Sequence, residues 1–81
     1  MKIIRITALW CPSCLVMKKV WDKTFTDIEV IDYDYDFDEE IVKQYEPGKI
    51  LPVLIKIEDG KEVDRIIGEK KIEEIKEFLG V

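Results

Sequence analysis

The sequence predicts an α/β fold in which a mixed four-stranded sheet carries helices on both faces. Three observations lead to this prediction. A strand-like run precedes each of two helical patterns in the first half, an Asp-Gly pair separates two strand-like runs near residue 60, and an apolar stripe of helical period lies near the end of the sequence. The expected order is β-α-β-α-β-β-α, in one domain over residues 1–81.

The first three elements form a strand, a helix and a second strand. Residues 2–9, "KIIRITAL", are apolar and β-branched, which is typical of a strand buried on both faces. A helix is expected from Pro12 to about Lys23, because proline in a first helical turn costs no hydrogen bond. Residues 27–36 alternate and predict the second strand. Such a unit implies a parallel pair joined by a right-handed crossover.

The remaining elements follow from stop signals and turn residues. Residues 38–46 predict a helix with acidic residues in its first turn, ended by the Pro47-Gly48 pair. Residues 53–67 flank Asp59-Gly60, a strong hairpin signal. A final helix is expected over residues 70–79, with one apolar stripe made of Ile72, Ile75, Phe78 and Leu79.

Composition excludes several classes of protein. The chain is 47% hydrophobic and 10% aromatic, which is typical of a globular protein and not of a disordered one. No apolar run approaches the roughly 20 residues that a membrane span needs. A net charge of −5 argues against nucleic-acid binding. The first ten residues lack the features of a secretory signal, so we expect a cytoplasmic protein. The expected oligomeric state is a monomer.

The amide content is also unusual. The chain has no Asn and one Gln, Gln44, whereas Lys and Glu are abundant. This balance is typical of hyperthermophilic proteins, so a thermophilic origin is one interpretation.

Both cysteines lie in the segment "LWCPSC", residues 9–14. Cys11 is expected at the N-terminus of the first helix, where free N–H groups and the helix dipole stabilise a thiolate. Cys14 follows three residues later, so both sulfurs can face the same side of the first turn. Pro12 stiffens this turn, and Trp10 flanks it with apolar surface.

Because the chain has no His, no imidazole can activate the thiol. Activation is expected from the helix terminus, with Lys18 or Lys19 as further candidates. A redox-active dithiol is the favoured interpretation, because C-x-x-C beside a βαβ pattern is typical of one. Three alternatives stay open: half a zinc site completed only in a dimer, a structural disulfide, and two inert core residues.

The acidic segment "DYDYDFDEE", residues 32–40, invites a calcium-site interpretation. An EF-hand loop needs Gly at its sixth position, and Phe37 stands there. Period two instead predicts a strand with Tyr33, Tyr35 and Phe37 on one face.

These motifs resemble the thioredoxin superfamily. "LWCPSC" is similar to its W-C-x-x-C active site, and residues 50–79 are similar to its second half: a proline before a strand, a D-G hairpin, a strand ending in glycine and an amphipathic helix. The resemblance implies a thioredoxin-like fold with a cis peptide at Pro52. It also implies that the backbone of Leu51 pairs with an extended substrate and that Gly68 lies near the groove.

The sequence departs from thioredoxins in two places and from glutaredoxins in a third. Pro12 and then Ser13 lie between the cysteines, which is the C-P-x-C order of glutaredoxins and some oxidases. By spacing from Cys11, Arg5 occupies the position of the family's buried acid, with Thr7 two residues on. The "GEKK" segment, residues 68–71, does not match the glycine pair and acid of a glutathione site. The chain is therefore interpreted as a compact thioredoxin of glutaredoxin size.

The predicted function is thiol-disulfide oxidoreductase, with Cys11 as the attacking thiol and Cys14 as the resolving one. No cofactor or metal is expected; the expected partners are disulfide-containing protein substrates and a recycling reductase. The residues expected in the substrate groove are Trp10, Pro12, Ser13, Leu51, Pro52 and Gly68. The alternatives are a non-catalytic binding module or shared-metal dimer and, within the class, an oxidant, an isomerase or a glutaredoxin-like protein.

Overall fold

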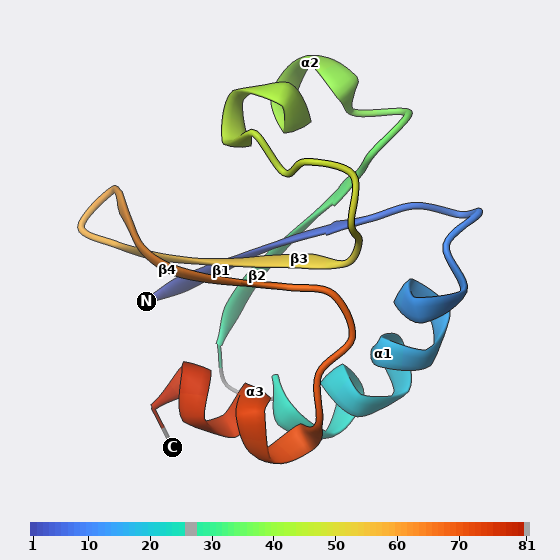
Figure 1. Cartoon of the computed structure of the whole chain (residues 1–81). Coiled ribbons are helices and arrows are strands. Elements are labelled where there is room, and N and C mark those ends of the chain that lie inside the picture. Colours follow the sequence, from blue (N-terminus) through green and yellow to red (C-terminus); the bar gives the residue numbers. More distant parts are fainter. Residues whose placement is uncertain (26–27, 81) are drawn as a thin grey trace.

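A computed structural model describes residues 1–25 and 28–80 (Figure 1). The sheet has the strand order β2-β1-β3-β4; β1 is parallel to β2 and antiparallel to β3, and β3 is antiparallel to β4. This confirms the mixed four-stranded sheet and the order of elements. The elements are β1 (Lys2–Thr7), α1 (Pro12–Thr24), β2 (Glu29–Asp34), α2 (Glu39–Val42), a 3-10 turn (Lys43–Tyr45), β3 (Val53–Glu58), β4 (Lys61–Ile67) and α3 (Ile72–Leu79).

Helices cover both faces of the sheet, with α2 on one side and α1 and α3 on the other (Figure 1). Each face has its own buried apolar cluster. We call the first the α2-side cluster; its buried members are Ile4, Ile6, Ala8, Cys11, Cys14, Val42, Leu51, Val53 and Ile55. The second, here the α1/α3-side cluster, has as buried members Ile3, Met17, Trp21, Leu54, Ile75, Phe78 and Leu79.

The first strand is shorter than predicted. It ends at Thr7 and not at residue 9, because the Cys11 N–H donates to the Ala8 carbonyl at 3.2 Å and closes a turn before α1. Ala8 is buried but Leu9 is exposed. The helix begins at Pro12 as predicted and ends at Thr24.

The prediction for the second strand is wrong at its end. β2 stops at Asp34, whose carboxylate accepts the N–H groups of Asp36 and Phe37 at 2.9 and 3.0 Å. The Asp38 carboxylate in turn accepts the Asp34 N–H at 2.8 Å. These local bonds turn the chain, so Phe37 is 80% exposed and shares no strand face with Tyr33. The predicted start, Asp27, lies outside the described residues.

The predicted helix over 38–46 is only partly regular. Its α-helical part is Glu39–Val42, and the 3-10 turn Lys43–Tyr45 continues it. Glu46 then adopts a left-handed conformation (φ 50°), and Gly48 follows at φ 77°. The chain therefore turns back toward β3 before the predicted stop at Pro47.

The hairpin is confirmed at Asp59-Gly60. Both residues have positive φ, 53° and 77°, as a two-residue turn of the primed type requires. A register shift between Lys56 and Ile57 inserts one extra residue, Val63, into β4.

The final helix begins at Ile72, two residues later than predicted. Ile75, Phe78 and Leu79 are buried, which confirms the apolar stripe, although Ile72 is only half-buried. Over residues 1–25 and 28–80, no helix combines the length and the apolar character that crossing a membrane requires.

Candidate active site

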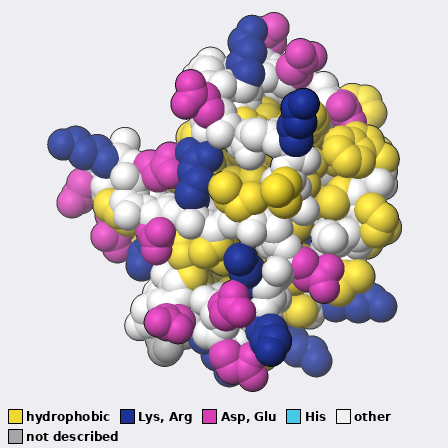
Figure 2. Space-filling view, in the orientation of Figure 1, with side chains coloured by type: hydrophobic (Ala, Val, Ile, Leu, Met, Phe, Trp, Pro, Cys, Tyr) yellow, Lys and Arg dark blue, Asp and Glu magenta, His cyan; other side chains and the backbone are white. Residues whose placement is uncertain are grey.

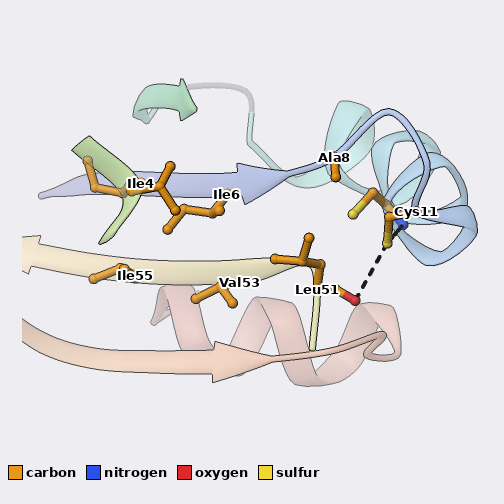
Figure 3. Close-up of a cluster of buried hydrophobic side chains, with 9 residues drawn as sticks. Ile4, Ile6, Ala8, Cys11, Leu51, Val53 and Ile55 are labelled. Carbon is orange, nitrogen blue, oxygen red and sulfur yellow. Dashed lines mark hydrogen bonds between the residues drawn. The ribbon is translucent and has the colours of Figure 1, made fainter. Parts of the chain in front are cut away.

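Cys11 lies at the junction of the β1–α1 loop and helix α1. It is the N-cap residue of α1, with extended backbone, and its Sγ accepts the N–H of Cys14 at 3.3 Å. The Cys11 thiol also points at the Leu51 carbonyl, at 3.8 Å (Figure 3). A thiolate at this position keeps the amide donor and faces the free N–H groups of the first turn, so the helix terminus stabilises the anion.

Cys14 lies one turn into the same helix and is fully buried. Burial is the largest of the influences that raise the pKa of the Cys14 thiol to about 12, and the neighbouring Cys11 adds to it. The Ala8 backbone and the positive charge of Lys18 act in the opposite direction and lower this pKa. Both cysteines are free thiols. The two sulfurs therefore differ: the Cys14 thiol stays protonated at neutral pH, whereas the Cys11 sulfur lies at the helix N-terminus and accepts the Cys14 N–H.

The Leu51 carbonyl faces Cys11, and the Pro52 ring that follows it is fully buried. The Leu51-Pro52 peptide is cis, which confirms that expectation. The Pro52 carbonyl accepts the Gly68 N–H at 2.8 Å, so the turn before β3 is tied to the end of β4. Gly68 has φ 87°, and a β-carbon there would lie 3.5 Å from an Ile50 methyl group. Among the described residues, no hydrogen-bond acceptor is found for the Leu51 N–H.

Trp10 is held against the turn that follows β2. Its indole N–H donates to the Asp36 carboxylate at 2.6 Å, and its ring meets that of Tyr35 edge-on, with centroids 6.1 Å apart. The Trp10 side chain is nevertheless 59% exposed. It therefore offers an exposed apolar surface, held in orientation by Asp36, next to Cys11 in the sequence.

Four apolar residues within two positions of Cys11 or Leu51 are exposed, and we call them the apolar rim. They are Leu9, Trp10, Pro12 and Ile50, whereas Cys11 and Leu51 themselves are buried. Ser13 is half-buried between the cysteines. Sequence reasoning missed Ile50, and it missed the contact of Asp36 with Trp10, because the alternating acids of residues 32–38 carry no signal that separates one from another.

Arg5 does not take the place of the missing acid. Its guanidinium lies on the other face of the sheet, 4.9 Å from the centre of the Trp21 ring and 5.5 Å from that of Phe25. It donates to both carboxylate oxygens of Asp32, at 2.6 and 2.8 Å. Arg5 is therefore part of the α1/α3-side packing and has no contact with the cysteines.

Two further features border the site without joining it. A hollow of about 500 Å³ lies between Tyr35–Glu39 and the segment 46–49, next to the Trp10 side of the rim, and neither cysteine lines it. In the part of the chain that the structure describes, no group of three or more potential metal ligands occurs. Cys11 and Cys14, both free thiols, are therefore the candidate reactive pair at this site.

Comparison with known proteins gives one consistent result. The sequence profile of the family described as Thioredoxin matches residues 1–80. A thioredoxin H-type protein of Picea mariana is 32% identical over 71 residues, covering 84% of this chain and 56% of that protein. Thioredoxin H2 of Arabidopsis thaliana is 29% identical over 75 residues, covering 88% and 55%. The chain thus spans little more than half the length of these relatives.

Solved structures agree on the fold. The Trxlp protein of Edwardsiella tarda superposes with a TM-score of 0.87 at 25% identity, covering 96% of this chain and 80% of that one. A reduced thioredoxin preprotein of Schistosoma mansoni gives 0.85 at 21% identity, covering 98% and 75%. The mixed sheet with helices on both faces is therefore the arrangement of these proteins.

Proposed function

The chain belongs to the thioredoxin family, and on that premise we propose that it reduces protein disulfides through Cys11 and Cys14. Members of this family work through their own cysteine pair and need no added cofactor. The observation that carries the proposal is the Cys11 sulfur at the N-cap of α1, facing the carbonyl before the cis-proline at 3.8 Å.

Reduction proceeds in two exchange steps. The Cys11 thiolate attacks one sulfur of the substrate disulfide, which forms a mixed disulfide and releases the other sulfur as a thiolate that takes a proton from water. Cys14 then loses its proton to water and attacks the Cys11 sulfur. The second substrate sulfur leaves as a thiolate and is protonated in turn. Two electrons pass to the substrate, and a separate reductase must restore the dithiol.

The different environments of the cysteines support these roles, because Cys11 caps the helix and is 6% exposed, whereas Cys14 lies inside the helix and is 0% exposed. Cys14 is fully buried and its pKa is raised to about 12, so it is a poor nucleophile toward an external disulfide. Once Cys11 is linked to a substrate, Cys14 lies three residues away on the same helix and attacks within the molecule. Cys11 therefore captures the substrate and Cys14 resolves the mixed disulfide.

The rim and the Leu51 backbone support a protein substrate. Leu9, Trp10, Pro12 and Ile50 offer exposed apolar surface next to Cys11 and Leu51 in the sequence. The Leu51 N–H, which has no acceptor among the described residues, can pair with an extended segment of the substrate. In this arrangement Pro12 and Ser13 border the groove beside Cys11, and Gly68 holds the cis Pro52 in place through the hydrogen bond that its N–H donates to the Pro52 carbonyl.

The test is a trapping experiment with a matched pair of variants. Cys14→Ser should accumulate a mixed disulfide with a peptide disulfide, seen as added mass that a reductant removes. Cys11→Ser should form none under the same conditions. A mixed disulfide that forms only through Cys14 would overturn the assignment of roles. Binding of the substrate by the unchanged dithiol, without turnover when dithiothreitol is the recycling reductant, would favour a binding module instead.

A further inference from the structure

Positive charge is concentrated in the segment that carries the cysteines. Residues 1–25 contain five Lys or Arg and one acidic residue. Residues 26–81 contain eight Lys or Arg and seventeen acidic residues. Although the net charge of the chain is −5, its positive and negative residues are therefore distributed unevenly between these two segments. A partner that approaches Cys11 from the α1 side meets a surface whose charge differs in sign from that of the protein as a whole.

Helix α1 presents this positive charge on its exposed side. Lys18, Lys19 and Lys23 are all exposed, and Asp22 is the one acidic residue of the helix. Within residues 1–25 and 28–80, no salt bridge joins any of the three lysines to another side chain. Figure 2 shows dark blue side chains beside α1, below the yellow side chains that gather at the right. The lysine charges are therefore available to a partner.

The geometry of the helix links these lysines to the active site. Val16, Lys19 and Lys23 follow Pro12 by 4, 7 and 11 residues, so they form one stripe that begins beside Cys11. Lys19 lies about 10 Å along the axis from Pro12 at 1.5 Å per residue. Val16 and the neighbouring Leu15 are 51% and 54% exposed. Along α1 from Cys11, exposed apolar side chains therefore come first and positively charged side chains follow.

The other flank of the site has the opposite sign. Asp36 binds the Trp10 indole, and Asp34, Asp38, Glu39 and Glu40 surround it in sequence. A partner docked on Cys11 therefore has one side over lysines and the other near carboxylates. Three lysines are too few for strong attachment to a phosphate backbone, whose affinity grows with each phosphate neutralised. A protein partner fits the apolar start of the stripe better.

We propose that the exposed face of α1 (Pro12, Leu15, Val16, Lys18, Lys19 and Lys23) docks protein partners that carry carboxylates on the side of their reactive disulfide that lies over this helix. This inference rests on the proposed function. Opposite charges near the apolar contact raise the encounter rate and fix the orientation of the partner, and added salt weakens both effects. The face thereby selects among disulfides that Cys11 attacks equally well in chemical terms.

The test uses three synthetic peptides, each closed by one disulfide and flanked by two Glu, two Ser or two Lys residues. The reduced full chain is mixed with each peptide, and the rate of its oxidation is read by alkylation and mass measurement. We expect the Glu peptide to react about tenfold faster than the Lys peptide at low salt, and about twofold faster at 0.5 M salt.

Two variants with equal charge changes locate the effect. Lys19→Glu should lower the Glu-to-Lys rate ratio by about three- to fivefold. Lys61→Glu changes the net charge by the same amount in the hairpin between β3 and β4, away from α1 (Figure 1). It should leave the ratio within about 1.5-fold of the unchanged protein, as expected for a distant screened charge.

Two results would overturn the docking surface: a ratio near one in the unchanged protein, or an equal shift of the ratio by Lys61→Glu and Lys19→Glu. The Ser peptide separates this inference from the proposed function. Its reduction by the unchanged protein, together with a ratio near one, would leave the oxidoreductase proposal standing and remove only the docking surface. Failure to reduce any peptide would contradict the proposed function itself.

Discussion

The two clusters on opposite faces of the sheet are built from similar apolar residues but hold different groups. The α2-side cluster contains both thiols and ends at the cis peptide before β3. The α1/α3-side cluster contains no sulfur nucleophile; it packs Trp21 and Met17 against helix α3, with the Arg5 guanidinium over the Trp21 ring. One face therefore places the reactive pair, and the other mainly stabilises the helix that carries it.

Helix α1 connects the two regions. Cys14 on its first turn is buried in the α2-side cluster, whereas Met17 and Trp21 further along are buried in the α1/α3-side cluster. If the two regions have different roles, a substitution should change either the reactivity of the cysteines or the free energy of unfolding, but not both. Substitutions on the first face should change reactivity, and substitutions on the second should change the free energy of unfolding.

The largest expected effect is on activity and comes from the α2-side cluster. Cys11→Ser removes the attacking sulfur, so reduction of a peptide disulfide should fall by at least about a thousandfold. The free energy of unfolding should change by no more than about 1 kcal/mol, because a hydroxyl can still accept the Cys14 N–H. Activity assays and denaturant unfolding of the same preparation measure both. Residual turnover above this level would mean that Cys14 attacks substrates directly.

The next effect belongs to the α1/α3-side cluster. Trp21→Ala should cost about 3–5 kcal/mol of unfolding free energy, because Trp21 is fully buried and its removal leaves a cavity. The alkylation rate of Cys11 in the folded protein should stay within about twofold of its original value, as expected for a site beyond direct contact.

Trp21→Phe is the matched control for this substitution. The Trp21 indole N–H is buried without a hydrogen-bond partner among the described residues, so its loss should cost less than the loss of the whole ring. A large change in Cys11 reactivity with either variant would show that the two regions are coupled.

A smaller effect should appear in the pH dependence of stability. The pKa of Cys14 is raised from 9.0 to about 12 in the folded protein. The unfolded chain therefore releases this proton at lower pH than the folded one, so the contribution to stability is complete below about pH 9 and is lost as pH rises toward 12. Near pH 11 the loss should be about 3 kcal/mol, or roughly 1.4 kcal/mol for each of the two pH units above the unfolded pKa.

Cys14→Ala provides the reference for this pH dependence, since it removes the titrating group. Denaturant unfolding of both reduced proteins between pH 8 and 11 measures the difference. If the unfolding free energies of the two proteins change with pH in parallel, the pKa of Cys14 is not raised by burial, and this part of the account is wrong.

The smallest expected effect concerns Arg5. Arg5→Met removes the ion pair with Asp32 and the contact with the Trp21 ring, but keeps most of the apolar stem. Because the Asp32 side chain is more than half exposed, the loss should be about 1 kcal/mol. The reduction potential of the cysteine pair should not move. A shift in potential would show that Arg5 influences the thiols despite lying on the other face.

Much of this architecture follows from local sequence signals. Pro12 at the helix start, Asp59-Gly60 at the hairpin and the Ile75, Phe78 and Leu79 stripe each act within a few residues, and the structure agrees with all three. The C-x-x-C spacing and the preceding strand were enough to predict that Cys11 lies at a helix N-terminus. The cis peptide at Pro52 was predicted only from the resemblance to the family.

Other features were not predicted because they depend on side chains that bind backbone groups or residues far away in the sequence. β2 ends early because the carboxylates of Asp34 and Asp38 bind backbone N–H groups, and a period-two pattern does not reveal which acid will do so. The Trp10–Asp36 bond joins residues 26 positions apart, beyond the range of any local pattern. The position of Arg5 over Trp21 likewise required the packed helix.

The most direct test of the account is the reduction potential of the Cys11–Cys14 pair. The full chain would be equilibrated in defined thiol and disulfide buffers, alkylated and weighed. We predict a single two-electron transition between a dithiol and an intramolecular disulfide, near the value of about −270 mV known for thioredoxin. A potential of roughly −120 to −200 mV would contradict a reductase and indicate an oxidant or isomerase. Failure to form the disulfide in any buffer would contradict the redox account altogether.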